Sequence, residues 1–562
     1  MGEIMIGNTM MDAPLTLLAL LERAEELFGD QEIISWIPDP NDRSDRPRPL
    51  VHRYRYADAC RRSRQLSSAL ANLGVQRGDR VATLATNHYR HLEAYLAVPC
   101  MGAVLHTVNV RLPPEQLIYI VRHGGAEVLL IDHLFARLIP PLLANCPALR
   151  AVLVMGGPQG LAASLGDKVF DYEAQVASGD PYFVYPQLAE SEASGLCYTS
   201  GTTGMPKGVV YSHRSTILHA LSAALPDTGN ISRHDTLLPV VPMFHVNAWG
   251  VPHSGLLAGS RLVFASIYND GASLARLMES ERVTGGTGVP TIWMGLADAL
   301  EEAIGAGHPY QLQLKSLLIG GSAVPEALIQ RLDRLGIQAI QGWGMTETSP
   351  IGSISRLPPG IDLGSELGGH LRAKQGPPVP LIQARVVDAS GADVPRDGVT
   401  MGRLLVRGPW VAERYYLSDS TDQVVQIGGQ NWLDTGDIAS IDGYGFIDIR
   451  DRAKDMIKSG GEWISSVFIE NLLMDHPAVA EAAVIATPDH KWGERPAAVL
   501  VLRSGAAASE EDFRQHLMDR LDRFPKWWLP DRYIFVPELP HSSVGKVLKR
   551  ALRERYGLTP PG

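Results

Sequence analysis

The sequence has little of what marks disulfide-stapled, membrane or nucleic-acid-binding proteins. Its four cysteines lie far apart in 562 residues and form no C-x-x-C pair, which argues against a zinc site or a disulfide framework and favours a reducing, cytoplasmic setting. No apolar run approaches the roughly 18 residues of a membrane helix, so we expect no integral membrane segment. The net charge of −10 supplies no basic field for a phosphate backbone, so we expect no nucleic-acid partner.

The sequence is rich instead in apolar residues, which make up 45% of the chain and can form large cores. Up to about residue 380, short buried strand patterns such as 80–84 and 316–319 alternate with helical patterns such as 15–28 and 57–74. This alternation predicts an α/β fold with layered subdomains. Beyond residue 380, strand patterns separated by turns predict a β-rich subdomain.

A charged run at 451–455 predicts the main domain boundary, because it follows a strand pattern at 446–449 and precedes the glycine-rich segment 459–461. We therefore expect a large N-terminal domain, residues 1–450, and a small α+β C-terminal domain, residues 451–562. The second segment is long enough to form a domain of its own.

The densest motif is Tyr-Thr-Ser-Gly-Thr-Thr-Gly-Met-Pro-Lys-Gly-Val at 198–209. Closely spaced glycines let a backbone approach an anion, hydroxyl groups donate hydrogen bonds, and Lys207 adds a positive charge. The combination suits a polyphosphate, although half of it would indicate only a surface turn. It is not the G-x-x-x-x-G-K-[ST] phosphate loop, because Lys207 stands in Pro-Lys-Gly.

This motif closely resembles the phosphate loop of the acyl-adenylate-forming superfamily, which includes acyl-CoA synthetases, adenylation domains of nonribosomal peptide synthetases and firefly luciferase. Several motifs are similar to those of bacterial medium- and long-chain fatty acyl-CoA synthetases and their methylthiopropionate-activating relatives. The resemblance implies that a carboxylate attacks the α-phosphate of ATP to give acyl-AMP, from which a thiol then displaces AMP. The further matches, in the order in which the superfamily has them, are 241–249, 320–325, 341–348, 434–437, 451–461 and 539–546.

The resemblance also implies a nucleotide site. Trp343 stands where the superfamily usually has Tyr and is expected to stack on adenine, while Asp437 and Arg452 are expected to contact the ribose. Without the resemblance, Asp437 could be a loop acid and Arg452 a surface ion-pair partner. The residues expected to bind ATP or AMP are Thr199, Ser200, Gly201, Thr202, Thr203, Lys207, Gly321, Ser322, Ala323, Gln341, Gly342, Trp343, Gly344, Met345, Thr346, Asp437, Ile449 and Arg452.

The resemblance implies roles in the chemistry as well. Thr346 offers a hydroxyl to the α-phosphate, and Glu347, together with Thr203, offers oxygen ligands to Mg²⁺. Taken alone, Met-Thr-Glu-Thr could be a helix-capping sequence. Lys546 is implied to neutralise the carboxylate and the α-phosphate during adenylation, and Lys458 to enter the site for thioester formation. The expected catalytic residues are Lys546, Lys458, His245, Thr346 and Glu347.

One small domain cannot place both lysines at the phosphate at once. The resemblance therefore implies that the C-terminal domain rotates between the half-reactions. Lys454 stands at the expected hinge, and Gly460, Gly461 and Trp463 are expected to line the CoA tunnel.

The acyl pocket is implied by the motif Phe-His-Val-Asn-Ala-Trp at 244–249. Trp249 resembles a gate that moves when ATP binds, and its alternative is a core aromatic. Amino-acid-activating relatives have Asp where this chain has His245, so amino acids are disfavoured. The apolar segment 289–294 could line a tail pocket or form core. The residues expected at the acyl pocket are His245, Val246, Asn247, Trp249 and Gly344.

The sequence therefore predicts an AMP-forming acyl-CoA synthetase that uses Mg²⁺, ATP and CoA to activate a medium- to long-chain fatty acid. The alternatives within this class are a ligase for a short thioether acid such as 3-methylthiopropionate, or for an aryl acid. Alternatives of another class are an acyl-AMP ligase that loads a carrier protein and a luciferase-like adenylate oxidase. A homodimer is also left open.

Overall fold

The computed structural model describes residues 9–42, 44, 47–199, 205–420, 422–460, 462–541 and 547–556. Within these ranges, no helix has the length and the hydropathy that crossing a bilayer requires. Six residues expected in the site lie outside the described residues, namely Ser200, Gly201, Thr202, Thr203, Gly461 and Lys546.

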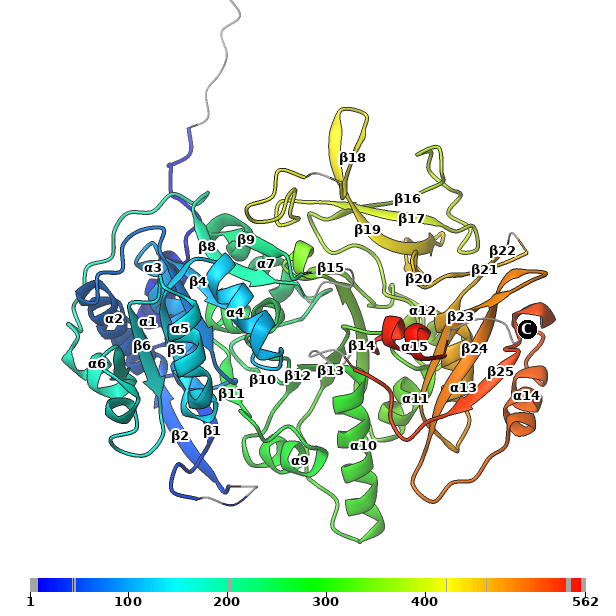
Figure 1. Ribbon diagram of the computed structural model, residues 1–562, viewed down its shortest axis with the longest axis horizontal. Coiled ribbons are helices and arrows are strands. Elements are labelled where there is room, and N and C mark those ends of the chain that lie inside the picture. Colours follow the sequence, from blue (N-terminus) through cyan, green and yellow to red (C-terminus); the bar gives the residue numbers. More distant parts are fainter. Residues whose placement is uncertain are drawn as a thin grey trace, which may run out of the picture.

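The first sheet lies in the N-terminal part of the chain, at the left of Figure 1, with strand order β7-β6-β5-β3-β4-β8-β9. Its strands are parallel except for the antiparallel pair β8–β9, which brackets the phosphate-loop motif. The bounds are β3 (Arg80–Leu84), β4 (Val104–Thr107), β5 (Ala126–Asp132), β6 (Ala151–Met155), β7 (Val169–Asp171), β8 (Ala193–Tyr198) and β9 (Gly208–Ser212).

Both faces of this sheet are covered by helices, because successive side chains of a strand point to opposite sides. Val128 and Leu130 of β5 join the core formed with α1, α2 and α3, whereas Leu129 and Ile131 join the core formed with α4 and α5. The helix bounds are α1 (Leu17–Phe28), α2 (Tyr56–Asn72), α3 (Tyr89–Cys100), α4 (Pro114–His123), α5 (Ile139–Asn145) and α6 (Tyr172–Ser178).

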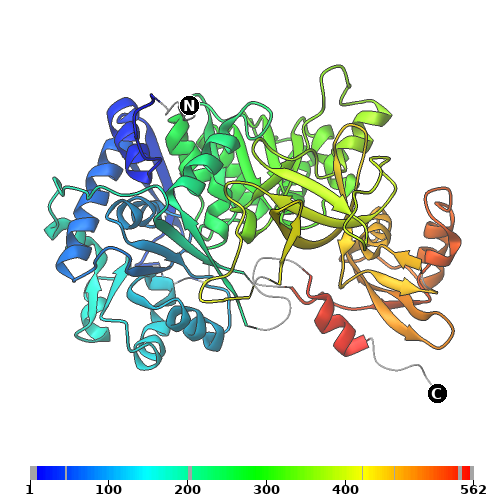
Figure 2. The same ribbon diagram turned by 90° about the horizontal axis from the view of Figure 1, so that it is seen from above.

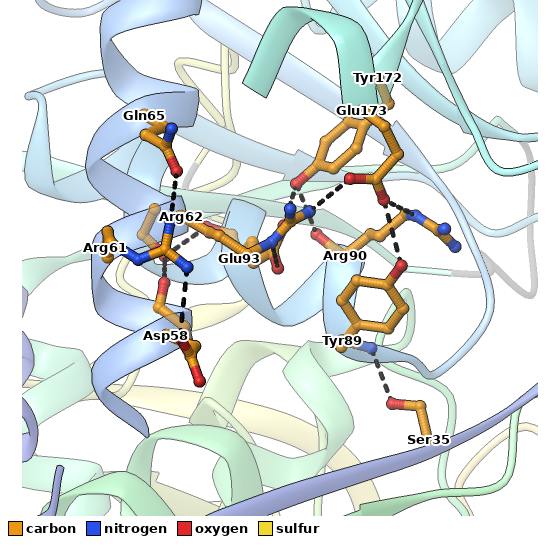
Figure 3. Close-up of polar contacts among 12 residues, drawn as sticks. Ser35, Asp58, Arg61, Arg62, Gln65, Tyr89, Arg90, Glu93, Tyr172 and Glu173 are labelled. Carbon is orange, nitrogen blue, oxygen red and sulfur yellow. Dashed lines mark hydrogen bonds and ion pairs between the residues drawn. The ribbon is translucent and has the colours of Figure 1, made fainter. Parts of the chain in front are cut away.

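A network of charged side chains joins α2, α3 and α6 (Figure 3). Arg62 donates to both carboxylate oxygens of the fully buried Glu93, over 2.7 and 3.1 Å, and the Tyr172 hydroxyl donates to Glu93 over 2.6 Å. Glu173 accepts from Arg62 over 2.8 Å and from Arg90 over 2.7 Å. Because each charge has a partner of opposite sign, the network can hold the helices together without exposing a reactive group.

The second sheet lies beside the first, with strand order β15-β14-β13-β12-β10-β11-β1-β2. It is parallel in its centre and antiparallel at the edge pairs β1–β2 and β14–β15. The bounds are β1 (Glu32–Pro38), β2 (Pro49–Arg55), β10 (Thr236–Pro239), β11 (Arg261–Phe264), β12 (Gly285–Gly288), β13 (Ser316–Ile319), β14 (Gln338–Gly344) and β15 (Ile351–Ile354).

Helices also cover both faces of the second sheet. One face packs against α9 (Gly271–Ser280), α10 (Pro290–Gly305) and α11 (Glu326–Arg334), whose apolar side chains share a core with the strands. The other face packs against α7 (His213–Ala224) and α8 (Val251–Ala258). Trp293 is fully buried in the first of these cores, so the segment 289–294, which the sequence left undecided, contributes to the core.

The β-rich subdomain follows α12 (Glu366–Arg372) and lies at the top of Figure 1. Its strands are antiparallel, as expected beyond residue 380. The strand expected at 446–449 continues to Arg452, because Arg452 still pairs with Asp437 of the neighbouring strand. The bounds are β16 (Gln383–Val387), β17 (Gly402–Arg407), β18 (Val424–Ile427), β19 (Gln430–Ile441) and β20 (Ile447–Arg452).

The C-terminal elements form a separate sheet with strand order β22-β21-β24-β23 and β25 paired to β24. Both views place it at one end of the molecule (Figures 1 and 2). Ile457, Leu472, Val484 and Phe513 belong to its own core. The architecture is therefore α/β layers, a β-rich subdomain and a smaller α+β domain, as predicted. The bounds are β21 (Ile457–Ser459), β22 (Glu462–Ile464), α13 (Ser466–Met474), β23 (Val479–Asp489), β24 (Gly493–Leu502), α14 (Glu510–Met518), β25 (Arg532–Phe535) and α15 (Lys549–Tyr556).

Candidate active site

The phosphate-loop motif connects the antiparallel strands β8 and β9, and its two ends are fixed by backbone hydrogen bonds. The Thr199 N–H donates to the Lys207 carbonyl over 2.8 Å, and the Tyr416 N–H donates to the Gly208 carbonyl over 2.7 Å. Lys207 is exposed, with its Nζ 4.7 Å from the centre of the Tyr415 ring. Backbone hydrogen bonds thus hold the base of the loop, and the Lys207 cation stands beside it.

Thr346 and Glu347 follow directly after β14 in a short 3₁₀ turn, Thr346–Thr348. The Tyr211 hydroxyl donates to the Thr346 carbonyl over 2.8 Å, which ties this turn to β9. Glu347 is only 7% exposed, and its Oε1 accepts from the Tyr415 hydroxyl over 2.6 Å. Burial and the neighbouring Glu347 carboxylate raise the pKa of Tyr415, so its hydroxyl keeps its proton and acts as a donor.

A cleft of about 320 Å³ opens beside these residues. Arg403, which donates to Asp434 over 2.8 Å, brings a second cation to it besides Lys207. Tyr415 and Arg403 were missed by the sequence analysis, since both stand outside the recognised motifs. The residues that line the cleft are Lys207, Arg403, Tyr415, Asp422, Gln423, Asp434, Gly436 and Ala453.

The residues expected to bind adenosine meet where β14, β19 and β20 lie together. Asp437 is 2% exposed; Trp343 Nε1 donates to its Oδ2 over 3.1 Å, and Arg452 Nε to its Oδ1 over 2.8 Å. Arg452 also donates to the Thr435 carbonyl over 3.0 Å. Ile449 lies on β20, where its N–H donates to Gln375 Oε1 over 2.6 Å. An acid, a cation and an aromatic ring thus converge in one place.

Gln341, Gly342, Gly344 and Met345 lie along the end of β14 and the residue after it. Gln341 is buried, and its Oε1 has no hydrogen-bond partner among the described residues. A buried amide oxygen without a partner is costly, so a ligand donor at this place would relieve it. The Met345 N–H, in contrast, is already used, because it donates to the Pro350 carbonyl over 3.2 Å.

The glycine motif at 320–321 brings the nucleotide and acyl motifs into contact. A Cβ on Gly320 would lie 2.6 Å from the Gly342 carbonyl oxygen and 3.3 Å from Trp249 Cη2. Gly321 has φ +81°, a backbone conformation that suits glycine, and a Cβ there would lie 3.5 Å from Trp249 Cζ2. Ser322 and Ala323, in the same motif, are exposed. Small residues here thus let the Trp249 ring pack against the turn.

The expected acyl residues form a left-handed turn at Val246–Gly250. Val246, Asn247, Ala248 and Trp249 all have positive φ, between 39° and 56°, which costs about 1–2 kcal/mol per residue. Side-chain contacts compensate part of this cost, because Asn247 Oδ1 accepts from the Tyr95 hydroxyl and from the Cys197 thiol, each over 3.3 Å. His245 precedes the turn and is half-buried.

An apolar cavity of about 60 Å³ lies behind Trp249, between the second sheet and helices α7 and α8. Of the expected acyl residues, Trp249 lines it, and His245, Val246, Asn247 and Gly344 do not. The lining residues are Ala223, Thr228, Gly229, Ile231, Leu237, Leu238, Trp249, Val251, Ser254, Gly285, Gly286, Thr287, Ser316, Leu318, Ile340, Ile351, Ile354 and Arg356.

The residues expected to serve CoA belong to the C-terminal sheet and its hinge. Lys458 and Trp463 face each other across the β21–β22 hairpin, with Lys458 Nζ 5.6 Å from the centre of the Trp463 ring. The Gly460 N–H donates to the Trp492 carbonyl over 2.7 Å, and Lys454 is exposed. In the part of the chain that the structure describes, no hydrogen bond or ion pair joins Lys458 to the Thr346–Thr348 turn.

Family models identify the chain. The model for the AMP-binding enzyme matches residues 41–416, and the model for the AMP-binding enzyme C-terminal domain matches residues 469–546. The chain belongs to the AMP-binding enzyme family. This confirms the predicted resemblance, whose motifs at 198–209, 241–249, 320–325 and 341–348 lie in the first matched region and the motif at 539–546 in the second.

Known AMP-binding enzymes resemble this one over nearly its whole length. The long-chain-fatty-acid–CoA ligase of Thermus thermophilus is 45% identical, over 98% of this chain and 97% of that protein. The 3-methylmercaptopropionyl-CoA ligase of Ruegeria pomeroyi is 41% identical, over 98% of this chain and 99% of that protein. The crystal structure of the anthranilate CoA ligase AuaEII in complex with anthranoyl-AMP superposes with a TM-score of 0.82 at 26% identity, covering 97% of this chain and 98% of that chain.

Proposed function

We propose that this AMP-forming acid–CoA ligase activates medium- to long-chain fatty acids with Mg-ATP and transfers the acyl group to CoA. The observation that carries the proposal is the apolar cavity behind Trp249. Trp249 also packs against Gly320 and Gly321, next to Gly342 in the expected nucleotide site. An acyl chain in the cavity would therefore hold its carboxylate beside the ATP α-phosphate, and burial of its methylene groups would supply the binding energy.

Nucleotide binding in this proposal rests on Trp343, Asp437 and Arg452. The indole presents a flat apolar face to adenine, and the Asp437 carboxylate accepts hydrogen bonds from ribose hydroxyls. Arg452 orients that carboxylate through their 2.8 Å contact. Lys207 and the loop after Thr199 would neutralise the phosphate charge that grows as pyrophosphate leaves.

Glu347 fits the role of a magnesium ligand. Within the described ranges, no three His, Cys, Asp or Glu side chains converge as a metal cage. Mg²⁺ commonly needs only one or two carboxylates besides phosphate oxygens and water, and Glu347 is a buried carboxylate that Tyr415 orients. Bound there, Mg²⁺ would offset the phosphate charge, with Thr203 as a second proposed oxygen ligand.

The two half-reactions are proposed to use different faces of the C-terminal domain, residues 451–562, against the N-terminal domain, residues 1–450. Two neighbouring residues at this boundary, Asp451 and Arg452, contact different domains. Asp451 accepts from the Ser466 N–H of α13 over 2.7 Å, whereas Arg452 pairs with Asp437 of β19. A hinge close to these two residues, at Lys454, would let the C-terminal domain rotate against the N-terminal domain.

A pair of variants tests this division of labour. Lys546→Ala is expected to abolish adenylation and to spare thioester formation from supplied acyl-AMP, and Lys458→Ala is expected to do the reverse. Each variant is the control for the other. Equal loss of both half-reactions in either variant would contradict domain alternation.

The substrate proposal is tested by pyrophosphate release with Mg-ATP across acids from propionate and 3-methylthiopropionate to palmitate, with benzoate, each with and without CoA. CoA-stimulated turnover that is highest with fatty acids of about eight to sixteen carbons supports it. A maximum at 3-methylthiopropionate would favour the second candidate, which the small volume of the cavity supports. Adenylation without CoA stimulation would indicate another acceptor.

Location and assembly are part of the proposal. Cys60, Cys100, Cys146 and Cys197 are all buried and unpaired, which suits a reducing, cytoplasmic compartment. A homodimer stays a prediction.

A further inference from the structure

The apolar cavity has a charged group at one place. Of the described residues that line it, Arg356 is the one with a charged side chain, and the others are apolar or small. Arg356 is half-buried and stands two residues beyond the end of β15. A guanidinium is an unusual wall for a site that binds hydrocarbon, because contact with methylene groups strips water from the charge.

The strand directions place Arg356 at the end of the cavity that lies away from the nucleotide. Strands β12, β13 and β14 are parallel, and Trp249 packs against Gly320, directly after the last residue of β13. The cavity reaches back to Gly285 and Ser316, the first residues of β12 and β13. From Ser316 to Gly320 the strand rises by about 13 Å. Because β15 runs antiparallel to β14, the chain beyond Ile354 approaches this same far end.

Arg356 is held at this end by one carbonyl group. Its Nε and Nη2 both donate to the Thr228 carbonyl, over 3.1 and 3.0 Å, and Thr228 and Gly229 also line the cavity. Among the described residues, no carboxylate lies within ion-pair distance of Arg356. Burial lowers the pKa of Arg356, and Asp227 opposes that shift from a distance. The hydrogen bonds to Thr228 therefore fix the position of the guanidinium.

We propose that Arg356, anchored on the Thr228 carbonyl, closes the far end of the acyl cavity and limits the length of the chains that this enzyme activates. The inference rests on the proposed function and narrows its substrate class to medium-chain acids. A longer chain would have to push its terminal methyl group against the guanidinium, or displace the guanidinium and leave the Thr228 carbonyl without a donor. Chains that end before Arg356 avoid both costs.

The test compares kcat/KM for palmitate with kcat/KM for octanoate in the full-length enzyme. In Arg356→Ala we expect the palmitate-to-octanoate ratio to rise about ten-fold, because the barrier at the far end is removed. The matched control is Arg80→Ala. Arg80 likewise donates Nε and Nη2 to backbone carbonyls, those of Gly124 and Gly125, but it does not line the cavity. The ratio should stay unchanged in this control.

A second variant, Gly285→Ala, leaves Arg356 in place and is expected to change the chain-length preference in the opposite direction. A Cβ on Gly285 would lie 3.4 Å from Leu237 Cδ2, an ordinary contact, and both residues line the cavity. Gly285→Ala should therefore fold and shift the preference toward chains shorter than those that the wild type prefers.

The outcomes distinguish an error in the role of Arg356 from an error in the proposed function. Wild-type turnover of fatty acids with an unchanged ratio in Arg356→Ala overturns the role of Arg356 and leaves the proposed function in place. A wild-type preference for dicarboxylic acids that Arg356→Ala abolishes would also overturn it, since Arg356 would then bind a polar chain end. If the wild type releases pyrophosphate with no fatty acid, the proposed function is wrong and this inference falls with it.

Discussion

Two regions of the molecule contain the same chemical pair, an arginine on a buried acid, in different settings. In the helix network, Arg62 and Glu93 are 19% and 0% exposed, and Tyr172 supplies a further donor to Glu93 (Figure 3). Between β19 and β20, Arg452 and Asp437 are 39% and 2% exposed, and the further donor is Trp343. Both acids are buried, but the second arginine is about twice as exposed as the first.

The difference shows that a buried acid–arginine pair does not by itself identify a functional site. Burial raises the pKa of Glu93 even beside Arg62, so the pair carries a desolvation cost, and its ion pair joins α2 to α3. Arg452 is more exposed than Arg62, and in the proposed function a ribose hydroxyl shares Asp437 with it. If Asp437 binds ribose as proposed, exposure of the arginine, rather than burial of the acid, separates a binding contact from a structural one.

The largest expected effect comes from breaking the structural pair. Arg62→Ala leaves Glu93 buried without its cation and should lower the free energy of unfolding by about 3–5 kcal/mol. Chemical denaturation measures this loss. Kinetic constants of the folded fraction should stay close to wild type, because the network lies away from the nucleotide residues.

The neighbouring Arg61 is the matched control. It lies on the same helix and bonds Asp58 and Gln65, each over 3.2 Å, at the surface (Figure 3). Arg61→Ala should cost less than about 1 kcal/mol. Equal losses in Arg61→Ala and Arg62→Ala would contradict the structural role of the buried pair.

The next effect concerns Glu347, the proposed magnesium ligand. Glu347→Gln removes the negative charge but keeps an oxygen that accepts from Tyr415, so we expect kcat/KM for Mg-ATP to fall about 100-fold with little change in Tm. Pyrophosphate exchange as a function of Mg²⁺ concentration measures it. Tyr415→Phe, which removes only the orienting hydroxyl, should lose less. A large fall in Tm for Glu347→Gln would instead make Glu347 structural.

Much of the fold was predictable, because local patterns determine it. The strands expected at 80–84 and 316–319 are β3 and β13 without any shift, since each is a short apolar run bounded by polar or glycine residues. The expected strand at 446–449 was too short, because its extension to Arg452 depends on the cross-strand partner Asp437. Pairing across a sheet is not visible in a local pattern.

Site residues were predictable only where they belong to a recognised sequence motif. Trp343, Asp437 and Arg452 were expected to share a ligand, and the structure brings them together, although their roles stay predictions. Tyr415 and Arg356 stand outside every motif, and only the tertiary fold places them at Glu347 and at the cavity. The left-handed turn at Val246–Gly250 has one glycine in five residues, so its backbone conformation had no signal in the sequence.

The smallest expected effect concerns the pair of Arg452 and Asp437. Trp343→Phe keeps an aromatic face for adenine but removes the N–H that donates to Asp437, while Arg452 still holds the other oxygen. We expect the KM for ATP to rise about five-fold with kcat unchanged, the effect of one hydrogen bond.

2′-Deoxy-ATP tells whether Trp343 acts through Asp437. If the indole positions the carboxylate for the ribose hydroxyls, its contribution to binding depends on those hydroxyls. With 2′-deoxy-ATP, which lacks one of them, Trp343→Phe should therefore raise the KM by less than five-fold. If the penalty is the same with ATP and with 2′-deoxy-ATP, Trp343 contributes by stacking on adenine alone. The contact with Asp437 would then be structural, like the contact between Tyr172 and Glu93, and exposure of the arginine would no longer distinguish the two regions.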